Sequence, residues 1–460
     1  MISSHLVAKS LLPHQVLGTI SKNEYSVLTD TRNISSDCIY IGLKGPSFDG
    51  GDYAQDAILK GAKVIIVNQD KKDSMLSLIK KTPEICIIIV DDTYCFLEDM
   101  AVRYREILRT QGLKKIIAIT GSNGKTTTKE MLSFLLESIA PRRVAHTFGN
   151  FNNHIGVPLT ILKTEKAIEY LIVEIGTNHP GEIKKLCEIC DPDCGIITNI
   201  GDSHLEFFKN RQGVYQEKLE LLRYLEKKKS FNFVTDGDDE FLGEVEDQKG
   251  VYKVGFGKKI NFTYGNGICT VCYNGINHSF ANQKILGQHN FKNLALAVSM
   301  TNLLFPNSLL AILEAATRFV PSKNRSQFIS WNNITIFSDA YNANPSSMEA
   351  SLKGFVAHLK GNNVGIEKCL FIIGDMYELG ESTEHKHIGI GKIANELGIK
   401  NPIFVGRYSG LYQVGFGSES TCFNSVQDAK LEIKTYIANK DWVFLKGSRG
   451  VMLEKLFDFN

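Results

Sequence analysis

The sequence predicts an α/β fold built from several parallel-sheet domains, and three observations lead to that class. Short runs rich in Ile and Val alternate with helical patterns along most of the chain, which is the order that places helices against a parallel sheet. A glycine-broken turn follows one strand and opens a helix between residues 114 and 140. The 460 residues also exceed what one hydrophobic core accommodates, so about three domains are expected.

Residues 1–110 are expected to form a small N-terminal α/β domain. CIYIGL, KVIIV and ICIIIV predict buried strands, and YAQDAILKGA predicts a helix that ends at glycine. The next segment, residues 91–112, predicts a long amphipathic helix that stops at Gly112 and leads into the second domain. One face of this helix carries Leu97, Met100, Ala101, Tyr104, Ile107 and Leu108.

A central domain is expected over residues 111–325, and a C-terminal domain over residues 326–460. The central domain opens with the strand KKIIAIT and alternates strands with helices, with polar, strand-like segments between residues 230 and 285. In the C-terminal part, ITIFSDAYN, CLFIIGD, NPIFVG and WVFLKG predict strands separated by helices. This order predicts a second parallel, doubly wound, Rossmann-like sheet.

The charge balance argues for a small-molecule partner rather than nucleic acid. The 52 basic and 50 acidic residues leave a net charge of +2, far from the basic footprint of a nucleic-acid binder. No basic start followed by an apolar core opens the sequence, and no apolar run approaches the roughly 20 residues of a membrane helix. We therefore expect a cytoplasmic protein without membrane insertion, and a monomer.

The ten cysteines are expected to be reduced thiols, because the cytosol keeps thiols reduced. Two C-x-x-C spacings, Cys187 with Cys190 and Cys269 with Cys272, resemble half-sites for zinc. The first pair falls in a helical pattern. The second lies in the strand-like ICTVCY, where alternation directs Cys269 and Cys272 to opposite faces. The context therefore argues against a four-thiolate zinc site.

The stretch AITGSNGKTTTKE, residues 118–130, predicts a phosphate-binding loop. Backbone N–H groups of such a loop converge on one point, and the helix that follows adds partial positive charge. Lys125 is placed to reach the β- and γ-phosphates, and Thr126 to offer its hydroxyl to magnesium. The first glycine of the usual phosphate-loop pattern would fall on Ile119, so the loop is a variant carried by Gly121 and Gly124. The alternative is a plain tight turn, which the lysine, the threonine and the flanking strand and helix disfavour.

Two further side chains lie where strands of the central domain end. Glu174 closes the strand YLIVEIG, and His204 follows the strand of GIITNIGDSHLE. Ligands collect beyond the carboxyl ends of strands in α/β sheets. Each residue could be a solvated loop residue, but together in one phosphate-loop domain they indicate magnesium ligands.

Lys218 breaks an otherwise apolar helical stripe. The stripe comprises Val214, Lys218, Leu221, Leu222 and Leu225. The lysine stem could cover apolar surface while its amine reaches water. Alternatively, burial lowers the pKa of the amine, and a neutral amine can react with carbon dioxide to form a carbamate, an anionic metal ligand.

The motifs of the chain resemble those of the ATP-dependent Mur ligases, which build the peptidoglycan stem peptide. TGSNGKTT, GNFNNHIGVPLT, VEIGTNHPGEI, TNIGDSHLE, YQEKLE and LGQHNFKNLALA follow in the family's order over nearly the whole chain. TDTRNIS with LKGPSFDGGDY resembles the family's UDP-binding N-terminal domain. SDAYNANPSSMEASL, IIGDMYELGE and LKGSRG resemble the C-terminal domain of the member that adds a dipeptide.

This resemblance implies an ATP- and Mg²⁺-dependent amide ligase that joins D-Ala-D-Ala to UDP-MurNAc-tripeptide through an acyl phosphate. The implied catalytic residues are Lys125, Lys218, Glu174 and His204, with Thr126, Glu174, His204 and a carbamate on Lys218 at the metal. Implied ATP contacts are Gly121, Ser122, Asn123, Gly124, Lys125, Thr126, Thr127, Asn290, Asn293, Arg325 and Asp339. The implied substrate contacts are Thr31, Arg32, Lys44 and Gly45 for UDP, Asn150, Asn152 and Asn153 for the muramoyl peptide, and Tyr341, Asn342 and Asn344 for the dipeptide.

Some positions leave alternatives open. On sequence grounds Asn290 and Asn293 could instead cap a helix. Thr29 stands before Asp30 where a serine is more usual, and Gly51 stands where many members have histidine, so the uridine contacts are the least defined. Rival functions are a Mur ligase for the third stem residue, a folate polyglutamate synthetase, a phosphate-loop GTPase or kinase switch, and a UDP-sugar-binding protein without catalysis.

Overall fold

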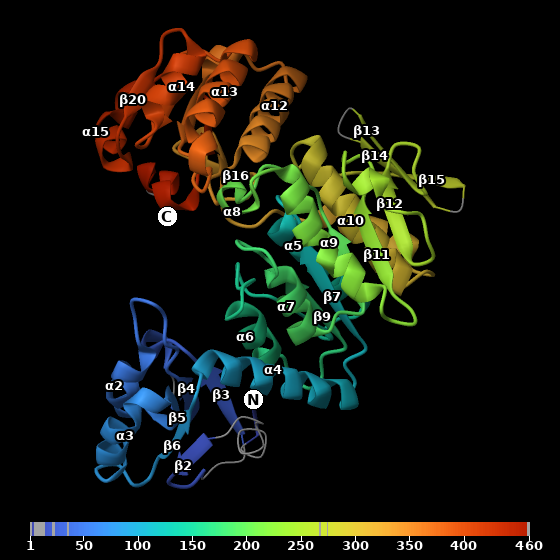
Figure 1. Cartoon of the computed structure of the whole chain (residues 1–460). Coiled ribbons are helices and arrows are strands. Elements are labelled where there is room, and N and C mark those ends of the chain that lie inside the picture. Colours follow the sequence, from blue (N-terminus) through green and yellow to red (C-terminus); the bar gives the residue numbers. More distant parts are fainter. Residues whose placement is uncertain are drawn as a thin grey trace. The chain divides into compact units, whose positions relative to one another are not determined.

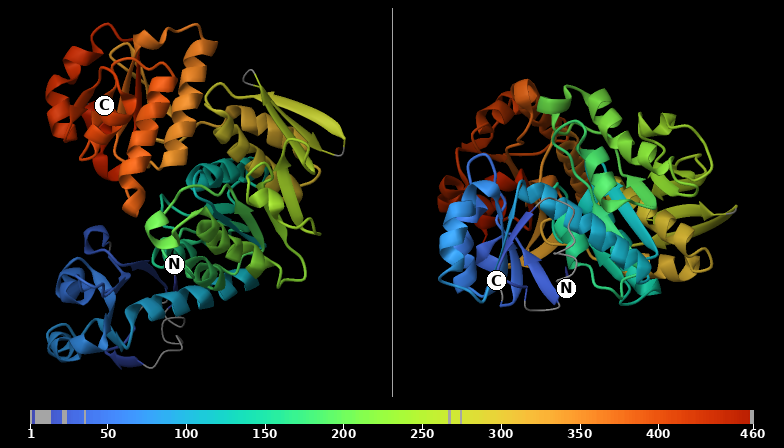
Figure 2. Two further views of the ribbon diagram at one scale, coloured as in Figure 1. Left: turned by 45° about the horizontal axis from the view of Figure 1, so that its top comes forward. Right: turned by 60° about the horizontal axis from the view of Figure 1, so that its bottom comes forward.

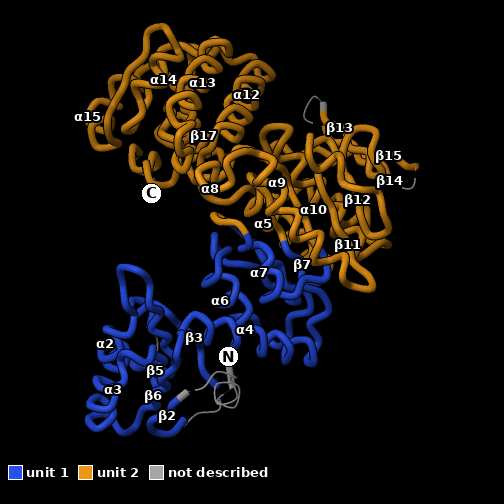
Figure 3. The backbone as a smooth tube through the Cα atoms, viewed as in Figure 1, with its two compact units in different colours: residues 1–118, 140–177, 181–194 blue, residues 119–139, 178–180, 195–460 orange. Residues whose placement is uncertain are grey.

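The computed structural model describes residues 2–3, 14–20, 24–34, 36–265, 268–273 and 275–457. The chain divides into two compact units (Figure 3). One comprises residues 1–118, 140–177 and 181–194, and the other residues 119–139, 178–180 and 195–460. Most of the first 15 residues lie outside the described residues. Among the helices of the described residues, none has the length and apolar character that crossing a membrane requires.

The N-terminal sheet has the strand order β1-β3-β4-β5-β6-β2. The four inner strands, β3 to β6, pair in parallel, and each is joined to the next by a crossover connection. The edge strands β1 and β2 pair antiparallel with β3 and β6. The core strand residues are buried, as the continuous apolar runs predicted. The elements are β1 (Ile2–Ser3), β2 (His14–Leu17), β3 (Glu24–Leu28), β4 (Cys38–Ile41), α2 (Ala54–Leu59), β5 (Ala62–Asn68), α3 (Lys72–Ile79) and β6 (Cys86–Val90).

The predicted long helix is α4 (Thr93–Thr110), visible as the extended blue-cyan helix in Figure 2. The side chain of Asp92 caps its N-terminus by accepting from the N–H groups of Tyr94 and Cys95. Gly112 follows its end with φ +118°. The predicted apolar face is buried except for Ile107, which is half-buried. The helix packs against β5 and against α6 (Gly156–Lys163) and α7 (Glu182–Cys190) of the same unit.

A nine-stranded sheet forms the central part, in the order β15-β14-β13-β12-β11-β10-β7-β9-β8. Strands β11, β12 and β13 pair in parallel, whereas β13, β14 and β15 pair antiparallel. The polar segment at residues 230–285 therefore extends the sheet first with parallel and then with antiparallel strands. The strands are β7 (Lys115–Thr120), β8 (Val144–His146), β9 (Tyr170–Glu174), β10 (Cys194–Ile197), β11 (Asn232–Asp236), β12 (Val251–Gly255), β13 (Ile260–Gly265), β14 (Ile268–Tyr273) and β15 (Ile276–Ala281).

Four more helices and one short turn of helix complete the central part. Helix α10 packs on β11, β12 and β13 and contacts α5 and α11 (Figure 1). Helix α10 is buried over most of its length because it lies between the sheet and α5. The helices are α5 (Lys125–Ile139), α8 (Leu205–Phe208), α9 (Arg211–Leu225), α10 (Gln288–Leu304) and α11 (Leu309–Arg318).

The C-terminal sheet has the order β16-β17-β21-β18-β19-β20 and is parallel except for the hairpin of β16 with β17. Alternate strand residues enter two separate cores. Phe337, Phe371 and Phe444 pack under α12, α13 and α14, whereas Ile336 and Val443 pack under α15. The elements are β16 (Gln327–Trp331), β17 (Ile334–Asp339), α12 (Pro345–Gly361), β18 (Cys369–Gly374), α13 (Thr383–Glu396), β19 (Ile403–Val405), α14 (Ser409–Phe416), β20 (Thr421–Phe423), α15 (Val426–Ile437) and β21 (Trp442–Lys446).

The α/β class and the doubly wound C-terminal sheet are confirmed. The boundaries at residues 110 and 325 stay predictions. The cysteine pairs lie as the pattern suggested: Cys187 and Cys190 on α7, and Cys269 buried while Cys272 on the same strand is half-buried. Within the described ranges, no three His, Cys, Asp or Glu side chains converge as a preformed metal cluster.

Two glycines let α13 and α14 approach each other closely. A Cβ on Gly391 would lie 2.2 Å from the carbonyl oxygen of Tyr412, and one on Gly415 would lie 2.0 Å from that of Ile388. Both obstructing atoms are backbone, so a side chain could fit only if the helices moved apart.

We predict that Gly391→Ala destabilises the C-terminal domain by about 1–3 kcal/mol, because the added methyl overpacks this contact. The matched control is Gly389→Ala on the same helix, where an added Cβ has no neighbour within 4 Å. The control should be neutral or stabilising by roughly 0.5–1 kcal/mol through helix propensity. Urea unfolding followed by tryptophan fluorescence measures both, since Trp331 and Trp442 both lie in this domain. Equal stability of the two variants would contradict the close approach.

Candidate functional site

The predicted phosphate loop is a turn between β7 and α5 that requires two glycines. Gly121 has φ +147° and Gly124 has φ +79°, both in the region that side chains disfavour. A Cβ on Gly121 would lie 1.8 Å from the hydroxyl oxygen of Thr198. A Cβ on Gly124 would lie 2.7 Å from the side-chain amide of Asn293. The loop is therefore shaped by its neighbours as well as by its own backbone.

The first half of the loop is held by the segment that follows β10. Asn199 accepts two hydrogen bonds from the loop, each 3.0 Å long. The N–H of Ser122 donates to the backbone carbonyl of Asn199, and the N–H of Asn123 donates to the side-chain oxygen of Asn199. The N–H of Gly201 donates to the hydroxyl of Ser122 at 2.8 Å. The hydroxyl of Thr198 donates to the carbonyl of Asn123 at 2.5 Å. These bonds direct the backbone of Ser122 and Asn123 toward protein.

The second half of the loop carries the predicted cation and hydroxyl. The amine of Lys125 donates to the carbonyl of Gly121 at 2.8 Å, across the mouth of the loop. Thr126 is buried at the start of α5, followed by Thr127. A 15-residue helix begins at Lys125, so its N-terminal partial charge favours an anion here.

Glu174 lies in the other unit, at the end of β9, and is buried. Its carboxylate accepts from the side-chain amide of Asn152 at 2.8 Å, and its N–H donates to the hydroxyl of Thr147 at 3.0 Å. The carbonyl of Asn152 accepts from the N–H of Gly176 at 2.7 Å. Two of the predicted residues, Asn152 and Glu174, thus form one polar cluster.

The other two asparagines of that stretch behave differently. The side-chain oxygen of Asn153 accepts from the N–H groups of Ile155 and Gly156, which fixes the turn into α6. Asn150 is exposed, and its carbonyl accepts from the N–H of Asn152 at 2.7 Å.

His204 initiates the short helix α8 with a left-handed backbone, φ +51°. Its Nδ1 lies 2.9 Å from a carboxylate oxygen of Glu378, which also has a positive φ, +61°. The contact with the His204 ring and the charge of Lys125 lower the pKa of Glu378. The two groups lie within ion-pair distance, but their geometry is not that of an aligned hydrogen bond. Glu378, within the quoted motif IIGDMYELGE, is a neighbour of the site that sequence reasoning missed.

Lys218 is on the buried face of α9, as its stripe predicted, and is 1 % exposed. Burial, together with the positive charge of Lys125, lowers its pKa well below the usual value. Glu217 beside it is also buried and opposes the shift. A snorkelling lysine would keep its amine in water, so the snorkelling alternative is wrong. A buried amine of lowered pKa close to a second cation is the environment that favours the neutral form.

Asn290 and Asn293 are both buried inside the first turns of α10. The N-cap position is Gly287, so the alternative that these asparagines cap the helix is wrong. The amide of Asn290 donates to the carbonyl of Leu286 at 2.9 Å and to the hydroxyl of Ser326 at 3.1 Å. Asn293 lies against Gly124, as the close approach described above shows.

Asp339 ends β17 and anchors the loop that follows. Its carboxylate accepts from the buried amine of Lys446 at 2.6 Å and from the hydroxyl of Ser351 at 2.9 Å. The N–H of Ser326 donates to the same carboxylate at 3.1 Å. Lys446 belongs to the quoted motif LKGSRG, but sequence alone did not single it out.

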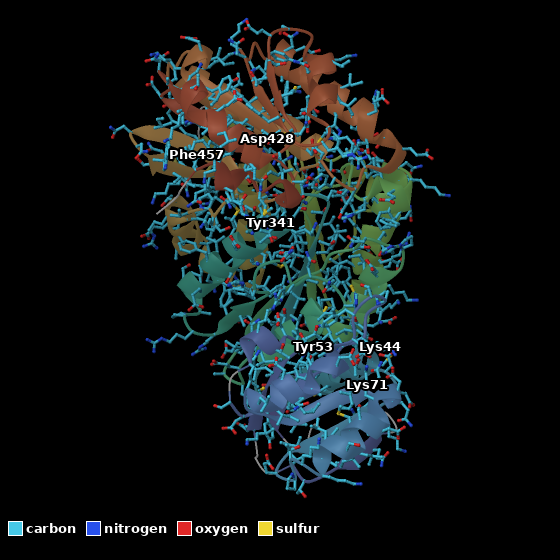
Figure 4. All side chains as sticks on the ribbon, turned by 90° about the vertical axis from the view of Figure 1, so that its left-hand side faces the viewer. Lys44, Tyr53, Lys71, Tyr341, Asp428 and Phe457 are labelled. Atoms are coloured by element: carbon cyan, nitrogen blue, oxygen red, sulfur yellow. The ribbon has the colours of Figure 1, made fainter. Side chains whose placement is uncertain are left out.

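Tyr341, labelled in Figure 4, lies under two cations. The guanidinium carbon of Arg325 is 3.7 Å from the centroid of its ring and that of Arg449 is 5.5 Å away. Asn342 accepts from the N–H of Ala343, and Asn344 caps α12 by accepting from the N–H of Ser347. The side-chain amide of Asn344 also donates to the side-chain oxygen of Asn123 at 2.7 Å.

The predicted UDP residues follow β3 and β4 in the N-terminal domain. Thr31 and Arg32 lie in one 3₁₀ turn, where Arg32 lowers the pKa of Asp30 to about 2. Lys44 pairs with Asp70, and the N–H of Gly45 closes a turn on the carbonyl of Phe48. Figure 4 labels Lys44 and Lys71. The stem of Lys71 covers Gly51, since a Cβ there would lie 3.1 Å from its Cγ.

The comparisons with known proteins agree with this arrangement of motifs. Residues 119–301 match the family model described as Mur ligase middle domain, and residues 324–449 match that of the Mur ligase, glutamate ligase domain. A Buchnera aphidicola protein named UDP-N-acetylmuramoyl-tripeptide–D-alanyl-D-alanine ligase is 32% identical, with 94% of this chain and 92% of the relative covered. The chain belongs to the Mur ligase family.

Other relatives support the same membership. The Bacillus subtilis protein of that name is 29% identical, with 97% of this chain and 96% of the relative covered. A crystal structure of MurF from Acinetobacter baumannii superimposes with a TM-score of 0.84 at 27% identity, covering 99% of this chain and 97% of the other. The family resemblance drawn from the motifs is thus confirmed, and the similarity extends over all three predicted domains.

We predict that Gly121→Ala weakens binding of a non-hydrolysable ATP analogue at least about tenfold, because the added methyl meets the Thr198 hydroxyl and the backbone is strained. Isothermal titration calorimetry measures this. Gly410→Ala is the control, since a Cβ there has no neighbour within 4 Å. An unchanged affinity in Gly121→Ala would show that the loop does not bind phosphate in the described conformation.

Proposed function

We propose that this protein is an ATP-dependent ligase that joins D-Ala-D-Ala to UDP-MurNAc-tripeptide in peptidoglycan precursor synthesis. The observation that carries the proposal is that one Mur ligase chain contains both the phosphate loop and the buried amine of Lys218. Its curated relatives, matched over nearly their whole length, are named for this reaction. The expected cytoplasmic location and monomeric state are part of the proposal.

Amide formation from a carboxylate in water needs an activated acyl group, which ATP supplies. In the proposed reaction an oxygen of the tripeptide carboxylate attacks the γ-phosphorus, ADP leaves, and an acyl phosphate forms. The amine of D-Ala-D-Ala then attacks the acyl carbon, phosphate leaves with the bonding electron pair, and the nitrogen loses its extra proton. Both partners of the first step are anions, so screening and alignment of their charges dominate the catalysis.

The residues of the phosphate loop fit this role. Because Ser122 and Asn123 give their N–H groups to protein, phosphate contacts fall to the loop from Gly124 onward and to the amine of Lys125. The start of α5 adds a favourable potential for the transferred phosphoryl group. Asn290, Asn293, Arg325 and Asp339 are proposed for the nucleoside, and Thr31, Arg32, Lys44 and Gly45 for UDP. Asn150, Asn152 and Asn153 are proposed for the muramoyl peptide, and Tyr341, Asn342 and Asn344 for the dipeptide.

The residues also fit magnesium and a lysine carbamate. Thr126, Glu174 and His204 would offer the oxygen and nitrogen donors, and the buried Nδ1 atom of His204 lies 2.9 Å from a carboxylate oxygen of Glu378. A carbamate on Lys218 would place an anion beside the cation of Lys125. Bound magnesium would neutralise phosphate charge and orient the triphosphate. The chain's own contribution is to position these donors and to keep the amine of Lys218 neutral.

One test of the proposed function concerns the reaction itself. With ATP, Mg²⁺ and UDP-MurNAc-tripeptide, phosphate release should depend on D-Ala-D-Ala, and the product should be heavier by the dipeptide. A phosphate-release assay followed by mass spectrometry of the product tests this. Release that instead needs a single amino acid or a folate would support one of the rival ligases. Nucleotide binding without release under any of these conditions would indicate a binding protein without catalysis.

Another test of the proposed function concerns Lys218. Lys218→Ala should lower kcat at least about a hundredfold, because a metal ligand is removed, and acetate or bicarbonate should restore part of the activity by supplying a carboxylate in the cavity. Lys129→Ala is a matched control, since Lys129 is an equally buried lysine of the same unit outside the proposed metal site. Loss that acetate rescues in Lys218→Ala but not in Lys129→Ala supports a carbamate. Full activity of Lys218→Ala would exclude a required carbamate.

A further inference from the structure

Asn123, at the centre of the phosphate loop, is held from two sides. Its backbone belongs to the central domain, where its carbonyl accepts from the side chains of Thr198 and Asn199 at 2.5 and 3.0 Å. Its side chain turns the other way, toward the start of α12. The side chain is therefore committed to the C-terminal part of the chain rather than to the loop itself.

The side-chain contacts of Asn123 form a closed ring with Asn344 and Ser346. Asn123 donates through Nδ2 to the hydroxyl of Ser346 at 3.1 Å, and that hydroxyl donates to Oδ1 of Asn344 at 3.1 Å. Asn344 completes the ring by donating through Nδ2 to Oδ1 of Asn123 at 2.7 Å. Each of the three side chains donates one hydrogen bond to the next and accepts one from the previous one, so they hold one another in a single arrangement.

The ring is tightly packed against the segment after β10. Gly201 has no side chain at this point, and a Cβ there would lie 2.7 Å from the hydroxyl oxygen of Ser346. The same segment makes a second contact with the C-terminal part, where the amine of Lys386 lies 2.6 Å from a carboxylate oxygen of Asp202. The ring is thus part of a continuous contact and not an isolated surface pair.

Asn344 ends the short segment between β17 and α12 that also contains Tyr341, and Ser346 lies in the first turn of α12 directly after it. That segment is rigid at both ends. Lys446 binds the carboxylate of Asp339 before it, and the capping box of Asn344 with Ser347 fixes the first turn of α12 after it. A displacement of the segment must therefore be transmitted to Asn123.

We infer that Asn123 is a positioning residue through which the segment Tyr341–Ser346 sets the conformation of the phosphate loop and hence its affinity for nucleotide. The inference rests on the proposed function, because the loop is taken as the nucleotide site and this segment as part of the dipeptide site. It assigns the asparagine side chain a role distinct from phosphate contact. Linkage then requires that nucleotide bound at the loop also favours the segment's present conformation.

A double-mutant cycle on nucleotide affinity tests the inference. Asn123→Ala, Ser346→Ala and the double variant are titrated with a non-hydrolysable ATP analogue and Mg²⁺. Each single variant should bind about three- to tenfold more weakly, as expected for loss of hydrogen bonds in a connected network. The double variant should bind no more weakly than Asn123→Ala alone. Ser346→Thr, which keeps the hydroxyl, should restore wild-type affinity.

The control variant is Ser425→Ala. Ser425 caps α15 in the same domain, with its hydroxyl accepting from the N–H of Asp428 at 3.2 Å. Ser425→Ala removes the cap of α15, just as Ser346→Ala disturbs the cap of α12. Because Ser425 is not part of the ring of Asn123, Asn344 and Ser346, nucleotide affinity should not change. Hydrogen exchange of the peptide covering residues 115–130 gives a second measurement on Ser346→Ala, which should exchange faster there although the substitution lies more than 200 residues away in sequence.

Additive losses in the double variant, or a Ser346→Ala protein with wild-type affinity and exchange, would overturn the inference while leaving the ligase proposal intact. Equal weakening by Ser425→Ala would reduce the effect to general destabilisation and would also overturn it. A wild-type protein that binds no ATP analogue would overturn both this inference and the proposed function.

Discussion

The close approach of the phosphate loop to the segment after β10 is the constraint on which the rest of the site depends. Gly121 can carry no side chain because Thr198 occupies that space, and Ser122 and Asn123 give their backbone N–H groups to Asn199. These bonds fix where Lys125 and the start of α5 lie. The same segment continues into His204, so one stretch of chain shapes the loop and also supplies a candidate metal ligand.

Electrostatics at the site are dominated by cations in low-dielectric surroundings. Lys218 is buried on α9, and the charge of Lys125 adds to the cost of protonating it. A buried unpaired ammonium is costly, so these surroundings favour the neutral form of the Lys218 amine. Glu378 compensates part of this positive potential through its contact with His204 and the nearby charge of Lys125, which explains the direction of its pKa shift.

The C-terminal part contributes polar contacts to this site through its loops and a scaffold through its sheet. Phenylalanines from β17, β18 and β21 fill one core and aliphatic residues fill the other, so the ends of the strands are held firmly. Asp339 at the end of β17 is bound by Lys446 at the end of β21, the strand that pairs with it. Segments that leave a rigid parallel sheet at its carboxyl edge can therefore present side chains in defined positions.

The sequence by itself determined the α/β class, many of the strands and helices, the strand–turn–helix of the predicted phosphate loop and the place of Lys218 on the buried face of its helix. These follow from local patterns: apolar runs, a glycine-broken turn, and one charged residue within an apolar helical stripe. Only the tertiary structure decided that Glu378 contacts His204, that Lys446 binds Asp339, and that the side chain of Asn123 joins Asn344 and Ser346. The partners in these pairs lie 107 to 223 residues apart in sequence, and Glu378 and His204 are comparably distant, so no local periodicity relates them. Their meeting depends on strand order and on the loops that the sheets bring to one edge, which the sequence pattern of each element alone leaves undetermined.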